Sequence, residues 1–293
     1  MKNKILLISL VCVVVLVSGC LDSNQKDDST KSAIEETQIN YRTSFDDYNY
    51  QLELKNEDFR LVCIQGCSAS DERFNESFSD LSRYVSLLKE VTKTNIVEEY
   101  APFEAHATED FRCKFASENT LAYANVMRDG NNITRGLMCL KSNEIATDVI
   151  VVHELTHLWQ LNRFPYNDAP EKLISEGFAG VMSSLSYPSN TNNSFCWEGN
   201  SPAVRGSGSS YEDRLYAKGR QLFYELCIDH GFDTDDVPEL FNKLDKNPPS
   251  NAEEFVLIIN EVVGEDTTQT FEKAGVYDIY YTDMGVYWGE YYQ

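Results

Sequence analysis

From residue 59 to residue 141 the apolar positions alternate in short runs, interrupted by one long stripe at helical spacing. Phe59–Gln65 alternates and is rich in β-branched residues, which predicts a strand. Between residues 71 and 92 the apolar residues recur at steps of three and four, which predicts an amphipathic helix: Phe74, Phe78, Leu81, Tyr84, Leu87, Leu88 and Val91. The short runs of 96–138, with a turn at 130–132, predict further strands, and 134–141 predicts one more.

From residue 142 onward the spacing becomes helical. Ser142 or Asn143 can cap a helix that runs to about Leu161, with apolar residues at Ile145, Val149, Val152, Thr156 and Trp159. Further helices are expected at 169–185, Tyr211–His230, 237–244 and Ala252–Val263, and a short one is expected to begin at Phe271. Strands early and helices late in the chain predict an α+β fold.

The first residues have the features of an export signal. Lys2 and Lys4 precede an apolar run of about 13 residues, too short to span a bilayer as a helix. The run ends in Val17-Ser18-Gly19-Cys20, which resembles the lipobox of prokaryotic lipoproteins and makes Cys20 the expected lipidation site. An ordinary cleaved signal or an uncleaved anchor, with Cys20 incidental, are the alternatives.

We therefore divide the chain into a signal peptide (1–19), a polar tether (20–49) and one domain (50–293). A lipoprotein signal, an ordinary cleaved signal and an uncleaved anchor would each place the domain outside the cytoplasm. As a lipoprotein, the chain is expected at the outer face of the cytoplasmic membrane, held there by its lipid anchor.

The net charge restricts the partners that the protein can bind, and the number of cysteines suggests disulfides. The net charge is −22, and −24 once Lys2 and Lys4 leave with the signal, which argues against nucleic acid as a partner. Six cysteines remain outside the signal and Cys20, and an even number outside the cytoplasm suggests disulfides with 15 possible pairings: Cys63, Cys67, Cys113, Cys139, Cys196 and Cys227. Cys63 and Cys67 are also close enough to form half of a metal site.

The segment His153-Glu154-Leu155-Thr156-His157 is an H-E-x-x-H motif inside a predicted helix. Two histidines four apart point the same way, so both imidazoles can reach one ion, and Glu154 can lean toward a metal-bound water. Glu176 follows His157 after 18 residues, enough for a loop and a return helix to bring back a third ligand. We expect one Zn²⁺ per chain on these residues. The alternatives are a packed or surface histidine pair and a solvated charge at Glu176.

With Glu176-Gly177-Phe178-Ala179, this pattern resembles the gluzincin metallopeptidases, whose third zinc ligand is a glutamate on the next helix. The glutamate helix is also similar to DA1-like peptidase domains. The order of elements fits from Phe59 to the C-terminus, with specific identity confined to 134–184 and 215–231. The resemblance implies a zincin-like domain with a small mixed N-terminal sheet, an H-E-x-x-H helix and a helical C-terminal lobe. It also implies peptide hydrolysis by a zinc-activated water, with Glu154 as general base.

Tyr216-Ala-Lys-Gly219 is similar to the Tyr-x-Lys-Gly of the gluzincin aminopeptidases, where the tyrosine stabilises the transition state. Tyr216 is therefore a second catalytic candidate. As an alternative it is one of 17 tyrosines packing a helix, and His230 is then the next residue to test as oxyanion donor.

Two departures from the family pattern affect the expected activity. Gly180 stands where thermolysin-like members carry an aspartate that orients a zinc-binding histidine. The Gly-x-Met-Glu-Asn segment of the aminopeptidases is also missing, and its nearest match, Gly136-Leu-Met-Cys-Leu140, lacks the amine-anchoring glutamate. Endopeptidase action is therefore favoured, with 134–140 expected as an edge strand that holds a peptide or protein substrate. The rival interpretation is a catalytically inactive surface lipoprotein that binds zinc or a protein partner.

Overall fold

The fold is taken from a computed structural model of the chain. The structure describes residues 36–37, 52–65, 72–95, 103–108, 122–129, 132–141, 148–160, 163–164, 169–201, 211–277, 279–282 and 285–288. The predicted signal peptide, Cys20 and all of the predicted tether except Glu36–Thr37 lie outside these residues. The elements form two compact units, the first holding the strands β1–β6 with the start of helix α1, the second holding the rest of α1 and all later elements.

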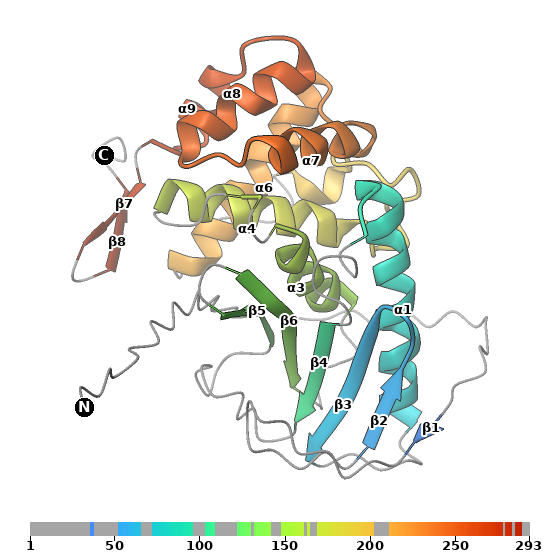
Figure 1. Cartoon of the computed structure of the whole chain (residues 1–293). Helices are drawn as coiled ribbons and strands as arrows, with labels where there is room; N and C mark the ends of the chain where they lie inside the picture. Colours follow the sequence, from blue (N-terminus) through green and yellow to red (C-terminus); the bar gives the residue numbers. More distant parts are fainter. Residues whose placement is uncertain are drawn as a thin grey trace, which may run out of the picture. The chain divides into compact units, whose positions relative to one another are not determined.

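The first unit is built on a six-stranded mixed sheet in the order β1-β2-β3-β4-β6-β5 (Figure 1). Its strands are β1 (Glu36–Thr37), β2 (Leu52–Lys55), β3 (Phe59–Gln65), β4 (Phe103–Thr108), β5 (Ala122–Asp129) and β6 (Asn132–Lys141). Strand β4 runs parallel to both β3 and β6, and the other pairs are antiparallel. The predicted bounds of β3 are confirmed, whereas β2 was not expected from the sequence.

One row of apolar residues crosses five of these strands and explains why they share a sheet. The paired positions are Leu54, Leu61, Ala105, Met138 and Ala124, and all are buried. Because strand side chains alternate between faces, a one-residue slip of any strand would move its member of this row to the other face. The buried row therefore sets the register.

The expectation that 134–140 forms an edge strand is wrong. Strand β6 lies inside the sheet, between β4 and β5, and β5 is the described strand at that edge. Backbone groups on both sides of β6 are already paired, so β6 has no free edge to which a substrate strand could be added.

The second unit is mostly helical. Besides the end of α1 (Glu72–Thr92), it contains α3 (Asp148–Gln160), α4 (Ala169–Ser184), α6 (Tyr211–His230), α7 (Val237–Lys246), α8 (Ala252–Val263), α9 (Thr268–Lys273) and the 3₁₀ turns η1 (Glu198–Asn200) and η2 (Thr234–Asp236). The predicted bounds of α6 and α8 are confirmed, and each ends at a glycine in the left-handed region, Gly231 (φ 74°) and Gly264 (φ 79°). The predicted caps of α3, Ser142 and Asn143, lie outside the described residues. The α+β class is confirmed.

The C-terminal region departs from the helical expectation. Strands β7 (Ile279–Thr282) and β8 (Gly285–Trp288) pair antiparallel in a separate two-stranded sheet. None of the helices in the described part of the chain has the length and apolarity that a membrane crossing requires.

Helix α4 is held by an aromatic cluster centred on Phe178. The fully buried Phe178 ring contacts four other phenylalanine rings at centroid distances of 5.0 to 6.1 Å: Phe164, Phe195, Phe223 and Phe241. Such aromatic pairs add about 0.5–1.5 kcal/mol each beyond the burial of their area. The cluster fixes the helix on which Glu176 lies two residues earlier.

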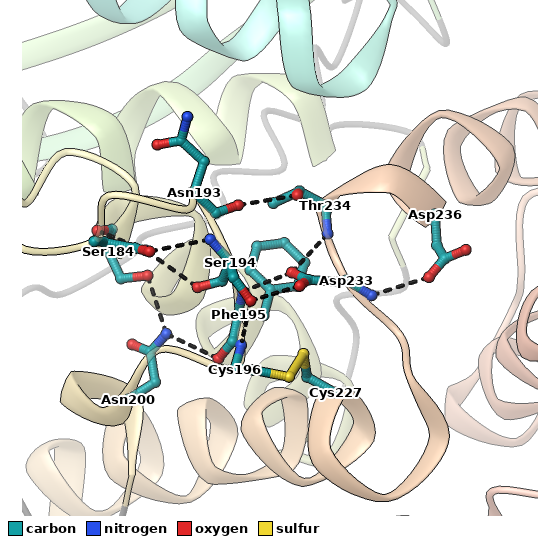
Figure 2. The surroundings of a disulfide bond; sticks show 11 residues. Ser184, Asn193, Ser194, Phe195, Cys196, Asn200, Cys227, Asp233, Thr234 and Asp236 are labelled. Carbon is teal, nitrogen blue, oxygen red and sulfur yellow. Dashed lines mark hydrogen bonds between the residues drawn. A yellow bond between two sulfur atoms is a disulfide. The ribbon is translucent and has the colours of Figure 1, made fainter.

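A disulfide between Cys196 and Cys227 ties the segment that follows α4 to the last turns of α6 (Figure 2). Beside it, the Asp233 carboxylate accepts hydrogen bonds from the backbone N–H groups of Phe195 (2.7 Å) and Thr234 (2.8 Å) and from the Ser194 hydroxyl. This disulfide leaves three of the 15 possible pairings of the six cysteines. Cys63 is also disulfide-bonded, which counts against the half metal site considered for Cys63 and Cys67.

Candidate metal centre

Helices α3 and α4 bring three ligand-type atoms together in the interior of the second unit. His153 Nε2 lies 3.1 Å from His157 Nε2, and both face the same carboxylate oxygen of Glu176, at 3.1 Å and 3.3 Å. All three residues are buried. One turn of α3 separates the two histidines, and α4 contacts α3 to supply the glutamate. The structure thus joins all three residues that the sequence marks as ligands.

The spacing of these three atoms fits a zinc ion. Zinc–nitrogen and zinc–oxygen bonds of about 2.0 Å in a tetrahedron give ligand–ligand edges of about 3.3 Å. The observed separations of 3.1, 3.1 and 3.3 Å match one face of such a tetrahedron. Two imidazoles and one carboxylate are also the donor set of open, catalytic zinc sites, whereas structural sites use four protein ligands rich in cysteine. The group can hold a metal.

Charge in the metal-free site is shared unequally among the three residues. Burial lowers the pKa of His153 to about 4 and outweighs its hydrogen bond to Glu176. Burial also opposes ionisation of His157, but attraction and hydrogen bonding to Glu176 overcome it and raise the pKa to about 8. Burial opposes ionisation of Glu176 as well, yet His157 and the hydrogen bonds from both imidazoles hold its pKa well below the usual range. Around neutral pH the extra proton of the site is therefore on His157, while His153 is neutral and Glu176 is ionised.

Metal binding should displace that proton. A ligating imidazole must be neutral, so the apparent zinc affinity is expected to fall about tenfold per pH unit below pH 8 and to level off above it. Competition against a zinc indicator at pH 6, 7, 8 and 9, corrected for the indicator's own protonation, measures this slope. If zinc binding released two protons per ion between pH 6 and 8, or none, the charge distribution given above would be contradicted.

Glu154 lies on α3 among the same residues but outside the ligand triangle. Its side chain is fully buried, and its negative charge contributes to the raised pKa of His157, which indicates that the carboxylate is near that imidazole. A buried carboxylate beside the ligands, and not itself one of the clustered ligand atoms, suits a proton acceptor.

Helices α4 and α6 cross with backbone against backbone, at Gly177 and Gly219. A Cβ atom added to Gly177 would lie 2.4 Å from the carbonyl carbon and oxygen of Gly219. A Cβ atom added to Gly219 would lie 2.5 Å from the Leu173 carbonyl oxygen. The glycines of Glu176-Gly177 and Lys218-Gly219 therefore have a steric function, since they let α6 approach the helix that carries Glu176.

That approach brings Tyr216 to His153, one of the candidate ligands. The Tyr216 ring lies edge-on to the His153 imidazole, with centroids 5.7 Å apart and an interplanar angle of 67°. His230, the alternative donor, lies 14 residues further along α6, or about 21 Å along its axis. Its two ring nitrogens face Glu265 Oε1 (2.7 Å) and Thr270 Oγ1 (2.8 Å). His230 is thus a connection between α6 and the C-terminal helices, and not an oxyanion donor for this site.

Two further residues at the site were not expected from the sequence. The buried Arg220 side chain crosses α4 at Gly180, where an added Cβ would meet its Nε at 2.5 Å and its Cγ at 2.6 Å. The Arg220 side chain from α6 therefore fills the space that a side chain at Gly180 would need. Gln160, in turn, faces Nδ1 of His157 at 2.7 Å. Its spacing of three residues from His157 on one helix was a signal that could have revealed it.

A second group of metal-ligating types, Cys196, Cys227 and Asp233, also clusters. Both sulfurs are consumed in the disulfide, and the carboxylate already accepts three hydrogen bonds. These contacts are those of a structural cross-link.

No protein-family model and no curated protein sequence matches the chain. Among solved structures, the chain is similar to the crystal structure of an aminopeptidase N family protein from Idiomarina loihiensis, with 10% sequence identity and a TM-score of 0.47. The match covers 83% of this chain and 46% of that protein. Because the chain spans less than half of its neighbour's length, the neighbour's activity is not carried over to it.

Proposed function

We propose that the chain is a zinc metallopeptidase of the gluzincin type with a zincin-like fold, in which His153, His157 and Glu176 hold one Zn²⁺. The observation that carries the proposal is the buried triangle of two imidazole nitrogens and one carboxylate oxygen, with sides of 3.1, 3.1 and 3.3 Å. All three residues belong to the H-E-x-x-H motif and the Glu176-Gly177 pair.

A zinc ion in this position would act as a Lewis acid toward a peptide carbonyl and would acidify water. Residues of the chain itself perform the other steps of the reaction. His153 is kept neutral by burial and Glu176 ionised by its two imidazole partners, as ligands require. Glu154 accepts the proton of the attacking water and returns it to the leaving amine. Tyr216 donates a hydrogen bond to the oxyanion that develops on the scissile carbonyl.

The decisive test combines metal content with turnover. Protein purified without added metal should contain one zinc per chain and cleave members of a mixed peptide library. A chelator should abolish cleavage, and added Zn²⁺ should restore it. His157→Ala is the control, because two remaining ligands should not retain the ion. A full equivalent of zinc in that variant would overturn the ligand assignment. Zinc-loaded wild-type protein that cleaves no peptide would favour the inactive zinc-binding alternative.

Cleavage of internal bonds is expected to be favoured over removal of N-terminal residues. The support is the absence of the amine-anchoring glutamate from Gly136-Leu-Met-Cys-Leu140. Acetylating the amine of a library peptide distinguishes the two activities. Strict loss of cleavage on acetylation would show that another acidic residue binds the amine and that the enzyme is an aminopeptidase.

We also propose that the enzyme acts outside the cytoplasm as a lipoprotein anchored through Cys20. The support is the lipobox-like end of the signal together with the disulfides, which persist in oxidising compartments. The net charge of −22 argues against a nucleic-acid partner. Detergent partitioning and the mass of wild-type and Cys20→Ser protein test the anchor, and identical behaviour of the two would refute it.

Tyr216→Phe is expected to lower kcat by about 100-fold and to change KM and zinc content little. A phenol hydroxyl that binds the developing oxyanion stabilises the transition state more than the ground state. Tyr224→Phe is the matched control, since Tyr224 is a half-buried tyrosine on the same helix about 12 Å further along its axis. Equal losses in the two variants would assign Tyr216 a packing function.

A further inference from the structure

The orientation of His157 is determined by a buried side-chain amide. His157 Nδ1 lies 2.7 Å from Gln160 Oε1, on the side of the ring opposite to the ligand triangle. Gln160 Nε2 in turn lies 2.8 Å from the backbone oxygen of Ser175, and the Ser175 hydroxyl donates to Gln160 Oε1 at 3.0 Å. His157, Gln160 and Ser175 are each at most 4% exposed.

The heavy atoms of this network allow one arrangement of hydrogens. A backbone carbonyl only accepts, so the Ser175 oxygen must receive an N–H of the Gln160 amide. The amide oxygen then faces His157, and because it can only accept, His157 Nδ1 must carry a hydrogen. In the neutral ring this leaves the lone pair on Nε2, the atom that faces His153 and Glu176.

The same amide also spans the two helices that supply the ligands. Gln160 is on α3 with both histidines, whereas Ser175 directly precedes Glu176 on α4. One side chain is thus bonded both to a ligand on one helix and to the backbone next to the ligand on the other. Gly180, at the position of the thermolysin-type aspartate, has no side chain to share this task.

We propose that Gln160 is the positioning residue of the metal centre: it fixes His157 in the tautomer that binds metal through Nε2, and is itself oriented by the Ser175 carbonyl. The inference rests on the metal site of the proposed function but not on its hydrolytic activity. A neutral amide suits this position because it orients the ring without adding a third negative charge to Glu154 and Glu176.

Two substitutions separate positioning from packing. Gln160→Met keeps the length of the side chain but removes all three of its hydrogen bonds. Gln160→Glu retains an oxygen acceptor for His157 Nδ1 and loses the donor to the Ser175 carbonyl. Gln221→Met is the matched control, since Gln221 is a half-buried glutamine on α6 that bonds Glu225 outside the site.

Zinc affinity, measured by competition with a chelating indicator, is the first readout. Gln160→Met is expected to bind zinc about 10- to 100-fold more weakly than wild type, Gln160→Glu to recover most of that loss, and Gln221→Met to stay within about twofold of wild type. Equal affinity of wild type and Gln160→Met would overturn the proposal. So would equal losses in Gln160→Met and Gln160→Glu, because a cross-helix packing function predicts that result.

The second readout needs no metal. The chain has four histidines, so ¹⁵N-histidine spectra of metal-free protein at pH 9.5 can be assigned by single substitutions. His157 should be in the Nδ1–H tautomer in wild type and in Gln160→Glu, and a mixture of tautomers in Gln160→Met. An unchanged tautomer in Gln160→Met would overturn the proposal. Failure of wild-type protein to bind zinc would refute the proposed function and leave this readout valid for Gln160.

Discussion

Glu154→Gln should leave one zinc bound per chain and lower peptide hydrolysis by a factor of about 10²–10⁴. Glutamine has nearly the shape of glutamate, and Glu154 is not one of the clustered ligand atoms, so the metal should remain. The amide cannot accept the proton of the attacking water, so the step assigned to this residue is lost. Metal content and kcat/KM on one library peptide are the measurements.

The same variant provides a readout that does not depend on activity. The Glu154 charge helps to raise the pKa of His157. Its removal should therefore lower the pH below which zinc affinity begins to fall, relative to wild type. Glu225→Gln, on α6 and outside the site, should change neither quantity. Retained hydrolysis in Glu154→Gln would show that another group accepts the proton. Lost zinc would mean that Glu154 supports the metal.

Gly177→Ala should strongly destabilise the packing of α4 against α6. Helix propensity alone favours alanine over glycine by about 1 kcal/mol. Here the added Cβ would lie 2.4 Å from backbone atoms of Gly219, which cannot move without separating α4 from α6. Overpacking costs about 1–3 kcal/mol where side chains can adjust, and we expect the upper end against a rigid backbone. Steric repulsion therefore outweighs propensity.

Thermal unfolding and zinc affinity measure this effect. A net loss of about 2 kcal/mol lowers Tm by roughly 4–8 °C in a protein of this size. Zinc affinity should fall as well, because Glu176 adjoins the substituted position. Gly264→Ala is the control, since its Cβ would meet no atom within 4 Å and only the left-handed backbone (φ 79°) opposes it. A Gly177→Ala protein with a raised Tm would show that the helices separate easily.

The contrast with Gly180 illustrates why a close approach by itself does not decide the outcome. A Cβ at Gly180 would meet Arg220 at 2.5 Å, a distance similar to that at Gly177. The neighbour is a flexible side chain, however, which can rotate away at a smaller cost. Gly180→Ala is therefore expected to be milder than Gly177→Ala, although both lie on the same face of α4.

Local signals were enough to predict the elements with strong patterns. Strand β3 and helices α6 and α8 have the predicted bounds because alternation, helical spacing and a following glycine are all encoded within a few residues. The short strands β2, β7 and β8 have four residues each and were missed. A four-residue strand acquires its stability from the partner it pairs with, and pairing is not visible in the local pattern.

The chemistry of the candidate site was likewise determined by the sequence. His153, Glu154 and His157 are arranged by the period of one helix, so their proximity follows from spacing alone. Glu176 required only that a loop return the next helix to the first. The tertiary structure decided everything that depends on contacts between distant segments. It placed β6 between β4 and β5, so that β5 and not β6 is the described strand at that edge of the sheet, and it selected the Cys196–Cys227 pair.

The tertiary structure was also needed to show how the candidate site is assembled. The crossing at Gly177 and Gly219 brings Tyr216 to His153, and the Gln160 amide lies between His157 and the Ser175 carbonyl. Neither can be read from a motif, because steric fit and hydrogen-bond direction depend on two helices at once. The sequence determined which ligands are present, and packing between α3, α4 and α6 decided how they are held.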